Sequence, residues 1–252
     1  MPAEKAEAIV LRTVDFSETS LVVTLFTREF GKVHGLAKGG RRLKGPFESA
    51  LDLLAHVRIV FLRKSSDALD LLTESKLVRR FRPAGHDLAS LYAGYYVAEL
   101  LGELTHDYDP HPELFDLAIE SLEALSSGAK VADRVLRYEL GALRLLGYLP
   151  SLDACVECGA DVPLTGRVAF SHARGGVLCS NCREGMGQAT HTHAGVLRTM
   201  AAFADLASDR WRRLEMDRNS QGELRGVLNH YLYALLGRKP RMHEYLGMLT
   251  AR

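Results

Sequence analysis

The sequence has no run of about 18 apolar residues, and residues 1–12 lack the continuous apolar segment of a signal peptide. Both absences argue against a membrane span and against export, so we expect a cytoplasmic protein. Net charge is also small, at +1 for 252 residues, so whole-chain charge indicates no polyanionic partner. Any argument for nucleic acid must therefore rest on a local cluster of charge.

Familiar catalytic motifs are missing as well. The phosphate-binding pattern G-x-x-x-x-G-K-[ST] fails because Phe26 stands where the first glycine should precede Gly31-Lys32. There is no G-x-S-x-G, and His243-Glu244 lacks the second histidine of H-E-x-x-H. We therefore expect a binding protein and not an enzyme, with a nuclease as an alternative.

Cysteine is scarce, and all four copies fall into two C-x2-C pairs, Cys155 with Cys158 and Cys179 with Cys182. Twenty residues separate the pairs, which is the spacing of a zinc ribbon. Because a reducing cytoplasm disfavours disulfides, two close pairs indicate a metal. Four thiolates fill the tetrahedral shell of one Zn²⁺ and leave no place for water, so we expect a single structural zinc. An iron–sulfur cluster, which also takes four thiolates, is the alternative.

The first eighty or so residues alternate short apolar runs with turn signals, which is typical of strands. The pattern predicts five of them, at 8–11, 21–26, 33–37, 53–62 and 69–77. Short, mostly antiparallel strands in this length favour a small barrel, because closure hides the edge strands. An OB-type barrel is the leading prediction, and an SH3-like barrel is the alternative.

After Pro83 the apolar spacing becomes that of amphipathic helices. Helical segments are predicted at 88–101, 114–125, 131–146, 196–206 and 224–236, with a short tail at 244–249. The cysteine pairs lie between them, within 151–188. The expected class is α+β, with an OB-fold domain at 1–82 and a helical domain at 83–252 that carries a zinc-ribbon-like insertion at about 151–188.

A local cluster of positive charge follows the third predicted strand. The segment 38–45 holds four cations and three glycines, and from Arg28 to Lys64 nine Lys or Arg residues outnumber three acids, a local net charge of +6. Glycines let a loop approach a polyanion closely, and cations neutralise phosphates with release of counterions. On an OB-type barrel this favours a nucleic-acid surface over a solvated loop.

Aromatic side chains that can stack on bases occur throughout the barrel region, at Phe16, Phe26, Phe30, Phe47 and Phe61. Most of them fall at alternating apolar positions, so we expect a place in the core for each. Phe47 stands beside the basic segment. It is therefore the first of the five to test as a base contact.

Several further segments occur in a fixed order along the chain: Ala8–Arg12, the Phe30-Gly31-Lys32 turn, the Ala37–Arg42 loop, Leu145–Pro150 before the first cysteine pair, and Phe170-Ser171 with Gly175–Cys179 at the second. In these segments the chain resembles the RecO family of bacterial DNA repair proteins over nearly its whole length. The resemblance implies an N-terminal OB fold, a helical domain, and a zinc module that some members have lost.

The resemblance also implies a function, that of a recombination mediator that hydrolyses no nucleotide. Such a protein binds single- and double-stranded DNA, anneals complementary strands, and works with RecR to load RecA onto DNA covered by single-strand-binding protein. It would be cytoplasmic and nucleoid-associated. Its basic residues would contact phosphates without reading the sequence. The predicted DNA-binding set is Lys32, Lys38, Arg41, Arg42, Lys44, Arg63 and Lys64.

Family members further recognise the C-terminal tail of single-strand-binding protein through their helical region. Arg134, Arg137 and Arg144 on one predicted helix are candidate charges for that tail, and a solvated helix face is an equal interpretation. The competing function is a zinc-ribbon transcription or translation factor. It would share the barrel and the four-cysteine site, but it would read a defined sequence or bind a ribosomal partner.

Overall fold

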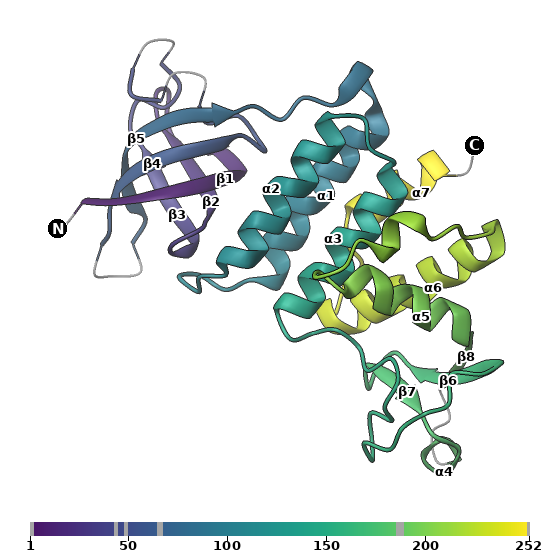
Figure 1. The fold of residues 1–252 in the computed structure, drawn as a ribbon. Coiled ribbons are helices and arrows are strands. Elements are labelled where there is room, and N and C mark those ends of the chain that lie inside the picture. The colour runs from purple at the N-terminus through teal and green to yellow at the C-terminus, as the bar shows by residue number, and fades with distance from the viewer. Residues whose placement is uncertain (1–2, 43–44, 48–49, 65–67, 185–188, 251–252) are drawn as a thin grey trace. The chain divides into compact units, whose positions relative to one another are not determined.

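The computed structural model describes residues 3–42, 45–47, 50–64, 68–184 and 189–250 of the chain. Five strands come first: β1 (Ala3–Asp15), β2 (Leu21–Thr27), β3 (Gly31–Ala37), β4 (His56–Leu62) and β5 (Asp70–Arg79). They pair in the order β1-β2-β3-β5-β4, and β4 pairs again with β1, so the sheet closes into a barrel (Figure 1). The β3–β5 pair is parallel and the others are antiparallel. The predicted OB-type barrel is confirmed.

The barrel is filled by the inward side of each strand. In β3 every second residue from Gly31 to Ala37 is buried, as expected of a strand with one face on a core. The inward residues form one cluster that includes Val10, Leu25, Val33, Ile59 and Leu72. Strand β1 is long enough to pair with β4 through its first half and with β2 through its second, which closes the barrel.

Strands β1 and β4 differ most from their predicted bounds. Strand β1 extends well beyond 8–11, because its polar flanks pair with two neighbours although they carry no apolar signal. Strand β4 begins at His56 and not at residue 53. Leu54 just before it has a φ of 64°, and the N–H of Ala55 donates to the carbonyl of Asp52, so this apolar segment is a turn.

The chain forms two compact units. Unit 1 comprises residues up to Val135 together with Arg241 onward, and unit 2 comprises Leu136–Pro240. Unit 1 holds the barrel, a 3-10 turn at Ala84–His86, α1 (Leu88–Leu104), α2 (Pro112–Ser126), the start of α3 (Val131–Leu145) and α7 (Met242–Thr250). The predicted division into domains at residue 82 stays a prediction, because α1 and α2 are grouped with the barrel.

Helix α7 returns to α1 within unit 1. The Glu99 carboxylate accepts hydrogen bonds from the backbone N–H groups of Arg241 and Met242, at 2.7 and 3.0 Å. The hydroxyl of Tyr96 hydrogen-bonds the ring of His243 at 2.7 Å, and both side chains are buried. These hydrogen bonds attach the start of α7 to α1, although the bonded residues are about 140 positions apart in the chain.

Unit 2 combines the rest of α3 with a small sheet and two long helices. Its elements are β6 (Arg167–Ser171), β7 (Gly176–Leu178), α4 (Ser180–Arg183), β8 (Thr190–His193), α5 (Ala194–Ala204), a 3-10 turn at Arg210–Arg213, and α6 (Arg218–Leu236). The strands lie in the order β7-β6-β8. A single apolar core joins the sheet to the helices. Across the described residues, no helix is both long enough and apolar enough to cross a membrane.

Candidate metal centre and nucleic-acid interface

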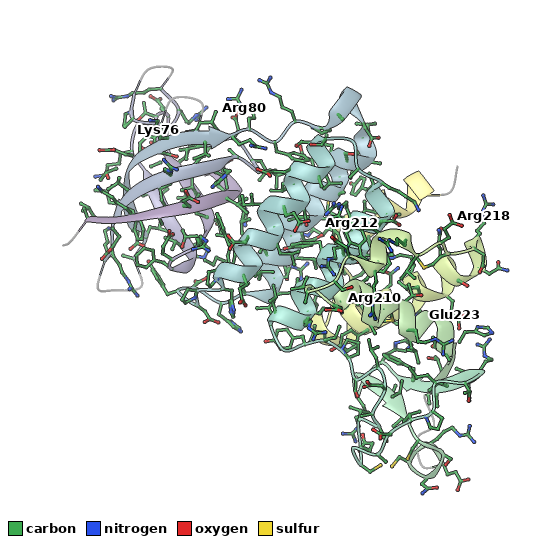
Figure 2. All side chains as sticks on the ribbon, in the orientation of Figure 1. Lys76, Arg80, Arg210, Arg212, Arg218 and Glu223 are labelled. Carbon is green, nitrogen blue, oxygen red and sulfur yellow. The ribbon has the colours of Figure 1, made fainter. Side chains whose placement is uncertain are left out.

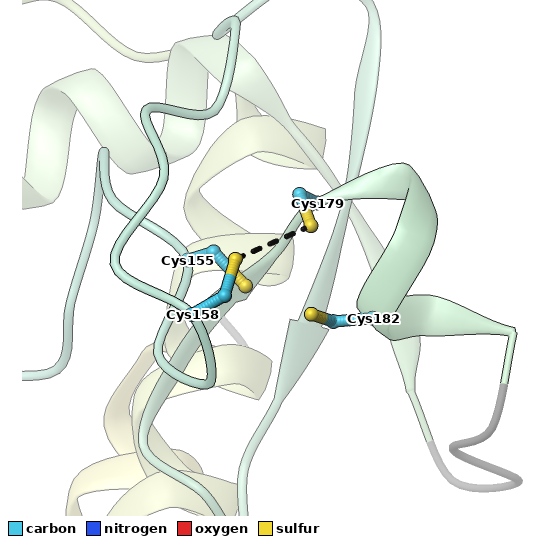
Figure 3. Close-up of side chains that lie close together, drawn as sticks. All are labelled: Cys155, Cys158, Cys179 and Cys182. Atoms are coloured by element: carbon cyan, nitrogen blue, oxygen red, sulfur yellow. Dashed lines mark hydrogen bonds between the residues drawn. The ribbon is translucent and has the colours of Figure 1, made fainter.

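Four cysteine side chains converge in unit 2 (Figure 3). Cys155 and Cys158 lie on a turn before β6, whereas Cys179 follows β7 and Cys182 lies in the single turn of α4. All four sulfurs lie within 4.8 Å of one another, and the sulfurs of Cys158 and Cys179 are 3.7 Å apart. Zinc–sulfur bonds of about 2.3 Å in a tetrahedron place sulfurs about 3.8 Å apart, so this spacing fits such a site.

The backbone around the cysteines favours thiolates at two of the four positions. The N–H groups of Cys179 and Cys158 lower the pKa of Cys155 to about 6, and the N–H of Cys182 is the main cause that lowers the pKa of Cys179. The neighbouring sulfurs raise the pKa of Cys182 to about 12. Four thiolates this close repel one another, so all of them ionise together only when a cation compensates their charge. The cluster can therefore hold a metal ion.

The cysteine turn is also part of the core of unit 2. Cys155 is 2% exposed, and Cys179 and Cys182 pack against the same apolar cluster. Backbone hydrogen bonds join the turn to β7: the N–H of Val156 donates to the carbonyl of Val177 at 3.0 Å, and that of Val177 donates to Ser151 at 2.9 Å. Loss of order at the cysteines would thus reach the core directly.

The basic loop after β3 begins with two tight turns. The N–H of Gly40 donates to the carbonyl of Ala37, and the N–H of Arg42 donates to the carbonyl of Gly39, which has a φ of 79°. This backbone places three of the predicted DNA-binding residues, Lys38, Arg41 and Arg42, on the surface. A fourth, Lys44, lies outside the described residues.

Arg41 joins the basic loop to the β1–β2 loop. Its N–H donates to the carbonyl of Thr19 at 3.1 Å, and its guanidinium donates to the carbonyl of Ser17 at 3.3 Å. The guanidinium also lies 3.2 Å from the Asp15 carboxylate. Both members of that ion pair are largely exposed, so its net contribution to stability is small and a phosphate can replace the carboxylate.

Lys32 occupies a different environment from the basic loop. Its ammonium donates to the carbonyls of Gly102 and Thr105 at 2.9 and 2.8 Å, and it lies 3.6 Å from the Asp107 carboxylate. The side chain is only 15% exposed. These carbonyls end α1, where the helix dipole attracts a cation. Lys32 thus joins β3 to the end of α1, and its ammonium is occupied by partners other than phosphate.

The residue before Lys32 supports this attachment. Gly31 has a φ of 69°, and a Cβ at that position would overlap the backbone of Asp109. The N–H of Tyr108 donates to the carbonyl of Lys32 at 3.0 Å. The Phe30-Gly31-Lys32 turn is therefore shaped by the segment that packs on it.

Replacement of Lys32 with methionine is expected to lower the free energy of unfolding by about 1–3 kcal/mol, because two helix carbonyls lose a charged donor. Affinity for DNA should change little. Urea denaturation and DNA titration of the same preparation measure both quantities. Lys38→Met, which alters an exposed cation, is the matched control and should show the reverse pattern. If Lys32→Met weakened DNA binding and left the free energy of unfolding unchanged, Lys32 would belong to the DNA interface.

Arg63 and Lys64 follow β4, whereas the basic loop follows β3. Strands β1 and β3 run in one direction and β4 runs in the opposite one, so the chain leaves β4 in the direction opposite to that in which it leaves β1 and β3. The last residues of β3 and β4 are two strands apart, because Leu36 and Leu62 both pair with Leu71 of β5. The guanidinium of Arg63 lies 4.2 Å above the Tyr108 ring. The exposed members of the predicted set therefore lie on two different loops, which the chain enters in opposite directions.

The outer face of β4 and β5 carries a pair of cations that the sequence analysis did not single out. Arg58 on β4 and Lys76 on β5 are direct cross-strand partners, and both are exposed. Figure 2 labels Lys76 on the barrel. Arg58 also lies 3.3 Å from the Glu7 carboxylate. Like charges placed opposite each other in a sheet repel, and a bound polyanion relieves that repulsion. Lys76 is therefore an additional candidate for phosphate contact.

The three arginines of α3 are not equivalent. Arg134 donates to the Glu120 carboxylate at 2.9 Å. Arg137 is buried, donates to the carbonyls of Phe203 and Asp205 at 2.8 Å, and lies against the Trp211 ring. The suggestion that Arg137 is a peptide contact is wrong, because its charge is directed into unit 2. Of the three, Arg144 is the exposed one.

The barrel phenylalanines divide sharply by exposure. Phe26, Phe47 and Phe61 are buried, and Phe30 packs edge-on against Phe61 at 5.5 Å, so the expected core role is confirmed for these four. Phe47, 4% exposed, is not available to a base. Phe16 is the exception, with 62% of its surface exposed. Its turn-forming neighbours from Asp15 to Ser20 were the sequence signal for that exposure.

The barrel, its exposed cations and the four-cysteine module together define a class of OB-fold protein extended by helices. Family models for the N- and C-terminal parts of recombination protein O match residues 1–81 and 85–244. The chain belongs to this family, which confirms the resemblance seen in the sequence.

Proteins named DNA repair protein RecO are similar to the chain over nearly its whole length. That of Rhodopirellula baltica is 43% identical, with 95% of this chain and 97% of the relative covered. The protein of Anaeromyxobacter dehalogenans strain 2CP-1 is 37% identical, with 98% and 96% covered. That of Symbiobacterium thermophilum is 32% identical, with 100% and 99% covered.

Proposed function

We propose that this protein acts in DNA repair and recombination as a mediator that binds DNA through the cations of its barrel. The observation that carries the proposal is the exposed basic loop with Lys38, Arg41 and Arg42, placed on an OB-type barrel in a chain of the recombination protein O family. The relatives named as DNA repair proteins support the same role. Cations of this kind contact phosphates and carry no sequence information.

The proposed activity is annealing of complementary strands without nucleotide hydrolysis. Two strands repel each other through their phosphates, and a cationic surface that binds both lowers this repulsion. The basic loop, including Lys44, forms the primary contact, and Arg63 with Lys64 forms a second contact on the loop after β4. The partners are single- and double-stranded DNA, RecR, and the tail of single-strand-binding protein, and the outcome is loading of RecA.

We further propose that Cys155, Cys158, Cys179 and Cys182 hold one Zn²⁺. The 3.7 Å sulfur spacing and the mutual repulsion of the thiolates support a tetrahedral divalent ion. Four protein ligands fill its shell, so the ion supplies folding energy and takes no part in a reaction. Metal analysis of the purified protein distinguishes zinc from iron.

The test of DNA binding is the double variant Arg41→Ala with Arg42→Ala. Loss of two phosphate contacts should lower the slope of log affinity against log salt by about 1.4 for single-stranded DNA, because each contact contributes about 0.7. Annealing in the presence of single-strand-binding protein should slow in parallel. The control, Arg212→Ala with Arg213→Ala, removes the same charge from unit 2. Unchanged annealing by the first variant would remove the loop from the mechanism.

The competing transcription or translation factor is separated by competition. A mediator that contacts phosphates should be displaced equally well by unrelated single strands, whereas a factor that reads a defined sequence should not. Incubation of labelled DNA with the protein and Mg²⁺ or Mn²⁺ tests for a nuclease by the appearance of shorter products.

A further inference from the structure

Phe16 is the most exposed large apolar side chain in the described part of the chain, at 62%. It lies in the loop between β1 and β2, where residues 12–19 are all exposed. Leaving a phenyl ring in water is less favourable than burying it. A ring held outside a well-filled barrel is therefore available to a partner.

The loop that carries Phe16 is closed by its own hydrogen bonds. The N–H groups of Phe16 and Ser17 donate to the carbonyl of Ser20 at 3.0 and 3.3 Å, and the N–H of Ser20 donates to the Ser17 hydroxyl at 3.2 Å. An ordered backbone presents the ring with little conformational entropy left to lose on binding.

The basic loop is attached to this same turn. Arg41 binds the carbonyls of Thr19 and Ser17 on the C-terminal side of Phe16 and the Asp15 carboxylate on its N-terminal side. The aromatic ring and the exposed guanidiniums of Arg41 and Arg42 therefore occupy one end of the barrel. The ligand that suits this surface combines a flat apolar face with an adjacent negative charge, and a nucleotide has both.

A planar base fits better than a peptide. Asp15 and Ser17 on either side of Phe16 are polar, and the only other apolar residue of segment 12–19 is Val14, which is 42% exposed. One ring and one valine do not make the continuous apolar groove that holds peptide side chains. Stacking on a base needs only one exposed aromatic face. In a duplex the bases are already stacked on one another, so such a contact favours a single strand.

We propose that Phe16 stacks on a base of single-stranded DNA while Arg41 and Arg42 hold the neighbouring phosphates. The inference rests on the proposed DNA-binding function and deepens it, because it names the residue that distinguishes single from double strands.

The experiment compares a thymidine oligonucleotide with an abasic strand of equal length. Phe16→Ala should bind the thymidine strand about 5- to 150-fold more weakly, which corresponds to about 1–3 kcal/mol per stacked base, and should bind the abasic strand as wild type does. Val78→Ala, another exposed apolar residue of the barrel, is the matched control and should bind both strands normally. The Arg41→Ala, Arg42→Ala variant should lose affinity for both strands.

A second variant gives a direct signal. The chain has one tryptophan, Trp211, which is buried in unit 2, so Phe16→Trp adds an exposed indole. Its emission should be quenched by the thymidine strand and not by the abasic one.

Three results bear on the inference in different ways. Equal affinity of Phe16→Ala and wild type for thymidine, with the arginine variant weakened, overturns the stacking and leaves DNA binding intact. A defect of Phe16→Ala confined to an acidic peptide with an apolar end shows a protein-binding surface instead. Absence of salt-dependent binding by wild type to either strand overturns the proposed function itself.

Discussion

Replacement of Cys179 with serine is expected to release the metal and to unfold unit 2 under conditions in which the wild-type protein is folded. Structural zinc in small peptides contributes about 10–16 kcal/mol of apparent binding free energy at neutral pH, and a whole domain is stable by only about 5–15 kcal/mol. The site lies against the core of unit 2 through Cys155, so its loss cannot be confined to a surface loop. The barrel has its own core, so we expect it to stay folded in this variant. The affinity for DNA should therefore change little, although unit 2 loses its stability.

Chelator-detected metal release and thermal unfolding measure the two effects. Trp211 is buried beside Phe203 and reports on unit 2 by its fluorescence. Ser180→Ala, next to Cys179 and carrying no sulfur, is the control and should keep metal and melting temperature. Acid should also weaken metal binding by the wild-type protein, because protons compete with the metal for the thiolates. Full metal content and a normal melting curve in Cys179→Ser would disprove the four-cysteine site.

Replacement of Arg225 with alanine is expected to lower the free energy of unfolding by about 3–5 kcal/mol, because it removes a bidentate cationic partner from a buried carboxylate. Glu139 on α3 is 0% exposed, and the guanidinium of Arg225 on α6 donates to both of its oxygens at 2.5 and 2.8 Å. The side-chain oxygen of Asn229 accepts a further hydrogen bond from Arg225 at 2.9 Å and holds the guanidinium in place.

Urea denaturation followed by Trp211 fluorescence measures the loss. The control is Arg28→Ala, because Arg28 makes an equally bidentate pair with Asp116, but on the surface, and its removal should cost far less stability than removal of Arg225. The double variant Glu139→Leu, Arg225→Met should recover much of the stability, since apolar residues replace the whole pair. Similar losses in the Arg225 and Arg28 variants would show that burial does not set the strength of this interaction.

The features that sequence reasoning identified are those encoded by neighbours in the chain. Two residues between cysteines suffice to predict a turn that directs both sulfurs to one point, and alternation within β3 suffices to predict a strand. Closure of the barrel followed from the need to cover edge strands. None of these steps requires knowledge of a distant partner.

The features that sequence reasoning missed depend on partners far along the chain. Lys32 is indistinguishable by charge from Lys38, and the carbonyls that bind it lie 70 and 73 residues away. Glu139 and Arg225 are separated by 86 residues. Phe47 was the first phenylalanine to test as a base contact because it stands near cations in sequence, yet its side chain enters the barrel core, as expected for most of these rings. Residues close together in the sequence reveal a local concentration of charge. They do not reveal whether a given side chain points into the core or into solvent.

The return of α7 to unit 1 has a consequence for synthesis on the ribosome. The contacts of Glu99 and Tyr96 with residues 241–243 cannot form until the whole of unit 2 has been translated. Both cysteine pairs emerge before that point, so unit 2 can acquire the proposed zinc ion while unit 1 still lacks its last helix. The order of translation thus makes the barrel-bearing unit the last to be completed, although it is the first to begin.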